Sequence, residues 1–122
     1  MPAEPRILLV DDDADVLELS ASVLARAGFA ITTASDGSAA LDRLTNEAPF
    51  AGLVTDDAMP GLSGRTLIAR ARAAQPGLRC LLISGRIDEA PVDGAYRILR
   101  KPFRAAALAV AVSVMMAAPD PA

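Results

Sequence analysis

Five short runs of Leu, Ile and Val alternate along the chain with longer segments whose apolar residues recur at helical spacing. We expect strands over residues 6–10, 30–34, 52–55, 78–83 and 96–99. Between the first two strands, one helical face carries Val16, Ser20, Val23 and Ala27, with Leu17 and Leu24, and Gly28 follows as a C-terminal cap. Further helices are expected over residues 37–46, 63–74 and 104–117. This alternation is typical of a parallel sheet whose strands are joined by crossover helices.

The segment over residues 86–94 departs from this pattern, because it is short and contains Pro91, so a full helix is not expected there. We find no internal repeat and no low-complexity linker. A chain of 122 residues with 52% hydrophobic residues is enough for one compact core. We therefore expect a single domain over residues 1–122, with flexible tails at 1–5 and 118–122.

Charge and apolar patterning exclude several classes of protein. A net charge of −3 leaves no evenly basic surface, so we expect this chain alone to bind no nucleic acid. The longest apolar segment, residues 105–118, falls short of the roughly 18 residues that indicate a membrane span, and the first residues do not resemble a secretory signal. Cys80 is the only cysteine and cannot form an internal disulfide, which favours the reducing cytoplasm.

The chain has no histidine, which excludes His-based triads and His-ligated zinc. Eleven of its twelve basic residues are Arg, and Lys101 is the only lysine. Chemistry in this chain must therefore depend on Asp, Ser, Thr or that single Lys.

Acidic residues follow two of the expected strands: Asp11, Asp12 and Asp13 after the first, and Asp56 and Asp57 after the third. If the strand order is 2-1-3-4-5, these two ends flank the point where ligands bind in open parallel sheets. Solvated loop acids are the alternative. Crowded carboxylates repel one another unless a cation intervenes, and an all-oxygen ligand set favours Mg²⁺, with Mn²⁺ as a substitute.

Two more polar residues follow the remaining strands at the same edge. Ser84 comes directly after the fourth strand and Lys101 directly after the fifth. A hydroxyl and an ammonium facing a metal-bound acid cluster would bind the oxygens of a phosphoryl group. Because Pro102 follows Lys101, we also predict a cis peptide bond that turns the lysine toward the site.

Four motifs occur in order at these strand ends: Ile7-Leu8-Leu9-Val10-Asp11-Asp12, Thr55-Asp56-Asp57-Ala58-Met59-Pro60, Ile83-Ser84-Gly85 and Lys101-Pro102-Phe103. Together they resemble the receiver domain of two-component response regulators, of the chemotaxis-receiver type, over almost the whole chain. The resemblance implies an α/β fold: a single flavodoxin-like, doubly wound (βα)5 domain with parallel order 2-1-3-4-5 and, given the short segment before the fifth strand, a short or absent fourth helix. The second and third motifs look most like those of hybrid histidine kinases.

By this resemblance Asp56 accepts a phosphoryl group from a phosphohistidine, and the chain changes its affinity for a partner. Asp12 would bind Mg²⁺ directly, together with Asp56, while Asp11 would act mostly through water and Ala58 would contribute its backbone carbonyl. The donor would be a histidine kinase or a histidine phosphotransfer protein. Such a domain is not an enzyme acting on other substrates, since it catalyses only its own phosphotransfer and autodephosphorylation.

The resemblance also assigns roles to the other two polar residues at this edge. Ser84 would bond the acyl phosphate after transfer, and Lys101 would pair with a phosphoryl oxygen. Asp13 and Asp57 are interpreted as solvated or second-layer neighbours. We further expect Arg86 and Ala58 to set the lifetime of the acyl phosphate by screening or admitting water.

One departure from the family concerns the switch. Ile98 stands where members usually carry an aromatic residue that rotates on phosphorylation, and Tyr96 lies too far along the strand to replace it. Aromatic switching is therefore not expected.

Two other functions remain open on sequence alone. One is a small Mg²⁺-dependent phosphohydrolase with an aspartyl nucleophile, although Ala58 stands where such enzymes carry a second Asp. The other is a degenerate receiver that serves only to bind proteins. The last helix is apolar around more than one face, so it forms either a docking or homodimer surface or an inert outer face of alanines.

Overall fold

The computed structural model describes residues 4–47, 49–86, 91 and 94–117. Its elements in chain order are β1 (Arg6–Val10), α1 (Ala14–Arg26), β2 (Ala30–Ala34), α2 (Gly37–Asn46), β3 (Gly52–Asp56), α3 (Gly64–Ala74), β4 (Arg79–Ser84), β5 (Arg97–Arg100) and α4 (Ala105–Ala117). The five strands form one parallel sheet in the order β2-β1-β3-β4-β5. This confirms the predicted single α/β domain and its strand order.

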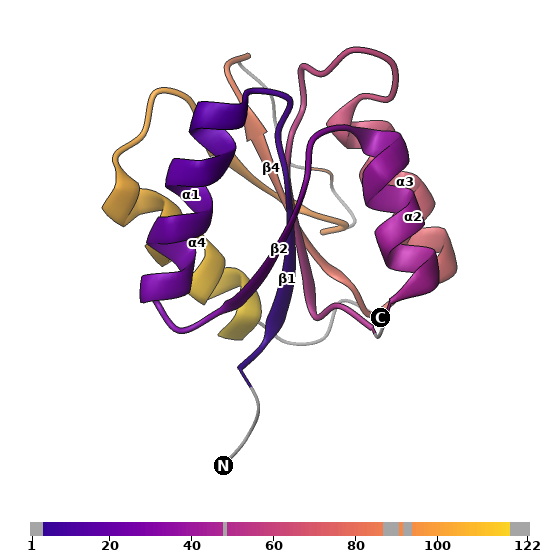
Figure 1. Cartoon of the computed structure of the whole chain (residues 1–122), viewed down its shortest axis with the longest axis horizontal. Coiled ribbons are helices and arrows are strands. Elements are labelled where there is room, and N and C mark those ends of the chain that lie inside the picture. The colour runs from indigo at the N-terminus through magenta and orange to yellow at the C-terminus, as the bar shows by residue number, and fades with distance from the viewer. Residues whose placement is uncertain (1–3, 48, 87–90, 92–93, 118–122) are drawn as a thin grey trace.

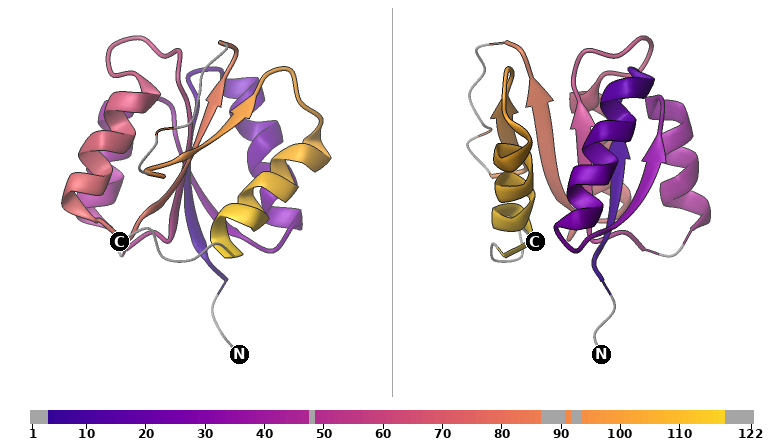
Figure 2. Two further views of the ribbon diagram at one scale, coloured as in Figure 1. Left: turned by 180° about the vertical axis from the view of Figure 1, so that it is seen from behind. Right: turned by 60° about the vertical axis from the view of Figure 1, so that its left-hand side comes forward.

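The sheet lies between two layers of helices (Figure 1). Helices α1 and α4 cover one face, and α2 and α3 cover the other, as the two further views also show (Figure 2). Right-handed crossovers between parallel strands place successive helices on the two faces in this way, and the strand order reverses between β1 and β3.

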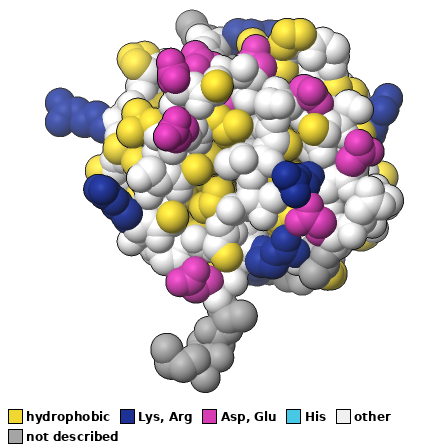
Figure 3. Space-filling model, in the orientation of Figure 1, with side chains coloured by type: hydrophobic (Ala, Val, Ile, Leu, Met, Phe, Trp, Pro, Cys, Tyr) yellow, Lys and Arg dark blue, Asp and Glu magenta, His cyan; other side chains and the backbone are white. Residues whose placement is uncertain are grey.

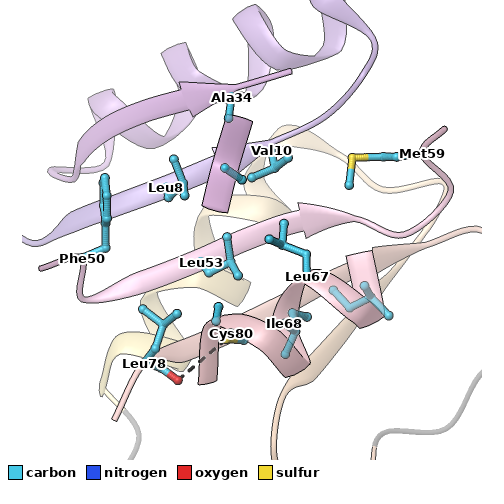
Figure 4. Close-up of a cluster of buried hydrophobic side chains, with 13 residues drawn as sticks. Leu8, Val10, Ala34, Phe50, Leu53, Met59, Leu67, Ile68, Leu78 and Cys80 are labelled. Atoms are coloured by element: carbon cyan, nitrogen blue, oxygen red, sulfur yellow. Dashed lines mark hydrogen bonds between the residues drawn. The ribbon is translucent and has the colours of Figure 1, made fainter. Parts of the chain in front are cut away.

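Strand alternation divides the core in two. Leu8 and Val10 point from β1 toward α2 and α3, whereas Ile7 and Leu9 point toward α1 and α4. On the first side, Leu53 packs opposite Leu67 and Ile68 of α3 (Figure 4). All four residues 7–10 are buried, so β1 is apolar on both faces as expected for a central parallel strand.

Three helices begin at side chains that cap their first turn. Asp13 Oδ1 accepts from the backbone N–H of Asp15 and Val16, and Asp36 Oδ1 accepts from that of Ala39. Ser63 Oγ accepts from the N–H of Thr66, so α3 starts one residue later than predicted. These caps fix where the loops above the sheet turn into helices.

A few sequence predictions need correction. On α1 the predicted face is confirmed at Leu17, Ser20 and Leu24, which lie toward the core, but Val16 is 39% exposed. The predicted helix over residues 104–117 is confirmed as α4, the fourth helix in chain order, and it follows β5. The predicted short or absent helix between β4 and β5 falls on a segment in which residues 87–90 and 92–93 lie outside the described residues. The predicted tails also fall largely outside them, at residues 1–3 and 118–122.

Helix α4 buries one side only. Leu108, Val112 and Met115 are in the core, while Val110 and Val114 are 61% and 47% exposed. Leu19 of the neighbouring α1 is 66% exposed, and hydrophobic side chains are visible on this side of the molecule (Figure 3). Among the described residues, no helix has both the length and the apolar character needed to cross a bilayer.

Candidate functional site

The predicted polar residues meet at the carboxyl edge of the sheet. The register pairs Val10 with Thr55 and Asp56 with Ile83, so the ends of β1, β3 and β4 lie at one level. The register also pairs Ser84 with Arg100, which brings Lys101 to the same level. Asp11, Asp56, Ser84 and Lys101 therefore all lie at this edge, as the parallel order requires.

Asp11, Asp12 and Asp56 form an acid cluster in which one carboxylate oxygen from each residue lies within 4.8 Å of the others. Asp11 and Asp56 are buried, whereas Asp12 is exposed. Acidic side chains are visible at the end of the molecule that carries these loops (Figure 3). The cluster joins residues 45 positions apart in the chain, so it is a product of the fold.

Burial, and then the negative charges of Asp56 and Asp12, raise the pKa of Asp11, against the lowering effects of Lys101 and of a backbone N–H. That N–H belongs to Asp13 and lies 2.9 Å from Asp11 Oδ1. Three carboxylates at this separation form an all-oxygen ligand set that suits a hard divalent ion. The acid cluster therefore fits Mg²⁺ and is typical of the magnesium site of receiver domains.

Lys101 contacts the acid cluster directly. Its Nζ lies 2.6 Å from Asp56 Oδ1, and its side chain is 42% exposed. The hydrogen bond to Asp56 raises the pKa of Lys101, so the ammonium is charged at neutral pH. The Lys101–Pro102 peptide bond is cis, as predicted. The backbone N–H of Lys101 also donates to the Ser84 carbonyl at 2.8 Å, which ties the ends of β4 and β5 together.

Ser84 is buried, and its Oγ accepts a hydrogen bond of 3.1 Å from the backbone N–H of Arg86. Ala58 lies two residues beyond Asp56 and is exposed. Ser84 ends β4 next to the end of β3 that carries Asp56, and the roles of Ser84 and Ala58 stay predictions.

Of the two interpretations of Asp57, solvated or second-layer, the structure excludes the solvated one. It is buried, and its two carboxylate oxygens accept from the backbone N–H and the Nε of Arg65, each at 3.2 Å. Arg65 also donates from Nη1 to the Tyr96 hydroxyl at 3.1 Å. Sequence reasoning missed Arg65, and the only available signal was an acid and an arginine flanking a tight loop. Asp13, by contrast, is exposed and serves as the cap of α1.

Gly64 allows α3 to lie directly behind the acid cluster. A Cβ on Gly64 would collide with the Asp56 carbonyl oxygen and lie 2.9 Å from Asp57 Cα. The Gly64 N–H donates to the Asp57 carbonyl at 3.0 Å. The main chain of both aspartates is therefore held by the first turn of α3.

Comparison with known proteins agrees with this geometry. Residues 7–113 match the profile of the response regulator receiver domain. The chain is 37% identical over 111 residues to the C4-dicarboxylate transport transcriptional regulatory protein DctD of Rhizobium meliloti, covering 86% of this chain and 24% of that protein. It is 36% identical over 105 residues to the response regulator receiver protein CpdR of Brucella abortus, covering 80% of this chain and 85% of CpdR.

A solved response regulator receiver protein from Sinorhizobium medicae superimposes with a TM-score of 0.80 at 34% identity, over 94% of this chain and 96% of that one. The chain thus spans about a quarter of DctD but most of the two single-receiver proteins. The predicted origin in a hybrid histidine kinase stays a prediction. With the fold, the acid cluster and the family match in agreement, the chain belongs to the response regulator receiver domain family.

Proposed function

We propose that Asp56 accepts a phosphoryl group from a phosphohistidine and that the phosphorylated chain changes its affinity for a partner. The single observation that carries this proposal is the contact of Lys101 Nζ with Asp56 Oδ1, at 2.6 Å, beside the acid cluster. A carboxylate cannot easily approach a negatively charged phosphoryl group unless cations offset the repulsion. The ammonium of Lys101 lies beside the carboxylate that would react.

In the transfer, an Asp56 carboxylate oxygen forms a bond to phosphorus while the phosphorus–nitrogen bond of the donor breaks. The bonding electron pair stays on that imidazole nitrogen, and because the other ring nitrogen of the reacting donor carries a proton, the donor is left with a neutral imidazole. Lys101 then pairs with an oxygen of the transferred group, and Ser84 donates its hydroxyl proton to another. A Mg²⁺ ion held by Asp11, Asp12, Asp56 and the Ala58 carbonyl would neutralise charge that develops on the phosphoryl oxygens.

The partner on the donor side is a histidine kinase or a histidine phosphotransfer protein. These 122 residues contain no histidine, so the phosphohistidine must lie outside them. Such transfers take place in the reducing cytoplasm. This location suits Cys80, whose pKa is raised to about 12 by burial, so that the thiol is inert.

The predicted homodimer through the last helix rests on the exposed side chains of Val110 and Val114 in α4. Sedimentation of the unphosphorylated and phosphorylated chain, with Val110→Ser as the comparison, tests it. A monomer in both states rejects the homodimer.

The phosphoacceptor proposal is tested by incubating the chain with Mg²⁺ and acetyl phosphate and recording the intact mass over time. We expect one phosphoryl group per chain in the wild type and none in Asp56→Asn. Fast hydrolysis of acetyl phosphate without an adduct would instead support the phosphohydrolase. No reaction at all would support a degenerate, protein-binding receiver.

The same adduct tests the two residues that we propose to control its lifetime. Arg86 and Ala58 are exposed and follow Ser84 and Asp56 by two positions. We expect Arg86→Ala to shorten the lifetime of the acyl phosphate, because loss of the long side chain admits water. If the dephosphorylation rate measured by intact mass is unchanged, the proposed screening role of Arg86 is wrong.

A further inference from the structure

Arg65, in the first turn of α3, joins two groups that are far apart in the sequence. Its backbone N–H and Nε bind the two carboxylate oxygens of Asp57, and its Nη1 binds the hydroxyl of Tyr96. The guanidinium is planar and rigid, so its two ends cannot move independently. A displacement of Asp57 should therefore move the Arg65 guanidinium and with it the hydrogen bond to Tyr96. A displacement of Tyr96 should move Asp57 in the same way.

The first end of this connection leads to the reactive carboxylate. Asp57 is bonded to Asp56 through one peptide unit, and its N–H donates to the Ile83 carbonyl at 3.0 Å. The Asp57 carbonyl accepts from the N–H of Gly64, and the absent side chain of Gly64 leaves room for the Asp56 carbonyl. The position of Asp56 thus depends on how firmly Asp57 is held against α3.

The second end leads back to the same carboxylate through β5. Tyr96 immediately precedes β5, and Lys101, which pairs with Asp56, immediately follows it. Tyr96 and Ile98 pack against the core cluster that contains Leu67 and Ile68 of α3. Asp56 is therefore linked to β5 twice, by Lys101 directly and by the path through Asp57, Arg65 and Tyr96.

We propose that Arg65 is a positioning residue for Asp56, acting through Asp57, and that its bond to Tyr96 makes the groove between α3 and β5 respond to the state of the Asp56 carboxylate. This groove, a hollow of about 370 Å³, is lined by Arg65, Ile68, Arg72, Ala95 and Tyr96 among others. The consequence for phosphotransfer rests on the proposed function. The mechanical coupling between Asp56 and Tyr96 does not rest on the proposed function, because it requires only that the charge on Asp56 changes.

The chain contains its own reporter for this coupling. Tyr96 is the only tyrosine and there is no tryptophan, so fluorescence excited at wavelengths longer than the phenylalanine absorption band comes from Tyr96 alone. Emission from a tyrosine is sensitive to hydrogen bonding at its hydroxyl, which here contacts Arg65. Substituting Asp56 by Asn removes the charge that holds Lys101, without adding volume, and imitates the loss of the free carboxylate on modification.

The experiment compares Tyr96 emission in the wild type, Asp56→Asn, Arg65→Gln and the double variant, after circular dichroism has shown equal helix content. We expect a difference in emission between the wild type and Asp56→Asn that is lost when Arg65 is replaced by Gln. Arg65→Lys is the second variant if Arg65→Gln does not fold, since a single amine keeps the positive charge but lacks the fork that reaches both partners.

Arg72→Gln is the matched control. Arg72 lies seven positions further along α3, lines the same groove and donates from Nη2 to the Pro76 carbonyl instead of to Asp57 or Tyr96. In the Arg72→Gln background, the emission difference between the protein with Asp56 and the protein with Asp56→Asn should remain in full. A role of Arg65 in stability alone would lower the unfolding midpoint but leave that difference intact.

Two results overturn the proposal: equal emission from the wild type and Asp56→Asn, or a difference that survives undiminished in the Arg65→Gln background. Neither bears on phosphotransfer, which is measured separately as the acetyl phosphate adduct. Absence of the adduct would reject the proposed function and leave the coupling through Arg65 standing.

Discussion

Asp56 and Asp57 are adjacent in the chain and both buried, yet their surroundings differ in kind. Asp56 belongs to the acid cluster and pairs with Lys101, a single flexible ammonium with a side chain that is 42% exposed. Asp57 lies outside the acid cluster and is held by the fork of Arg65 at two oxygens. A compact, mobile cation can change partners, whereas a forked guanidinium fixes geometry.

The end of β3 thus provides both a reactive carboxylate, at Asp56, and a neighbouring carboxylate that fixes its position, at Asp57. The carboxylate of Asp56 lies near the like charges of Asp11 and Asp12, and the ammonium of Lys101 offsets their repulsion. The flexible lysine side chain can follow a transferred group. The carboxylate of Asp57 has its hydrogen bonds satisfied within the fold. Removing the charge should therefore cost stability at Asp57 and little or none at Asp56, although both positions carry the same residue type.

The largest effect is expected from Gly64→Ala, which disturbs both aspartates at once. Its Cβ would collide with the Asp56 carbonyl and approach Asp57 Cα, and backbone cannot easily move away. We expect the free energy of unfolding in urea to fall by about 3 kcal/mol. Gly85→Ala is the control, because its Cβ meets no atom within 4 Å. Equal losses in the two variants would contradict the close packing of α3 on β3.

Asp57→Asn and Asp56→Asn separate the two carboxylates. Asp57→Asn weakens a part-buried ion pair in which Arg65 bonds both carboxylate oxygens, and it should lower the free energy of unfolding by about 2 kcal/mol. Asp56→Asn loses a half-exposed pair with Lys101 but relieves repulsion from Asp11 and Asp12, so the change without Mg²⁺ should stay within about 1 kcal/mol. Chemical denaturation of both variants measures this contrast. The reverse order of stabilities would reject the division between the two residues.

Lys101→Arg keeps the charge but replaces the mobile ammonium with a larger fork. We expect adduct formation from acetyl phosphate to slow about tenfold, since the bulkier group misplaces the cation beside Asp56. Stability should hardly change. If the adduct forms at the wild-type rate in this variant and changes partner affinity as in the wild type, lysine is not required at position 101.

Asp11→Asn tests the cost of the acid cluster as a function of pH. The folded-state pKa of Asp11 lies above its unfolded value of 3.8, chiefly because of burial, so its contribution to stability is present below that value and is lost as pH rises through the folded pKa. The variant should therefore match the wild type in acid and become the more stable of the two toward neutral pH.

Two comparisons complete that test. Added Mg²⁺ should stabilise the wild type at neutral pH and have less effect on Asp11→Asn. Asp13→Asn is the control, because Asn replaces Asp well as a helix cap. Thermal melts across the pH range would contradict the account if Asp11→Asn were no more stable than the wild type at neutral pH.

Much of the fold and the cluster could be predicted from the sequence because both follow from short-range patterns. Apolar runs such as residues 6–10 define strands, and parallel order then brings Asp11 and Asp56 together without any knowledge of side-chain conformations. The cis bond at Pro102 follows equally from local chemistry.

Features that depend on long side chains or on tertiary packing could not be predicted. Periodicity places Arg65 on α3 but does not say that its guanidinium reaches Asp57 on one side and Tyr96 on the other. Val16 and Leu17 both belong to the predicted face of α1, and which of them is covered depends on the neighbouring α4, which no window within α1 contains. The strand pattern argues against Tyr96 as a rotating switch, and it carries no signal for the bond to Arg65.

The central claim is that Asp56, and not its neighbour Asp57, takes the phosphoryl group. Borohydride reduces an acyl phosphate to an alcohol but leaves a free carboxylate unchanged, so it marks the modified residue permanently. After treatment with acetyl phosphate and Mg²⁺, reduction and peptide sequencing by mass spectrometry should find homoserine at position 56 and unmodified aspartate at position 57. A reduced residue at 57, or none in a chain shown to be folded, would contradict the account.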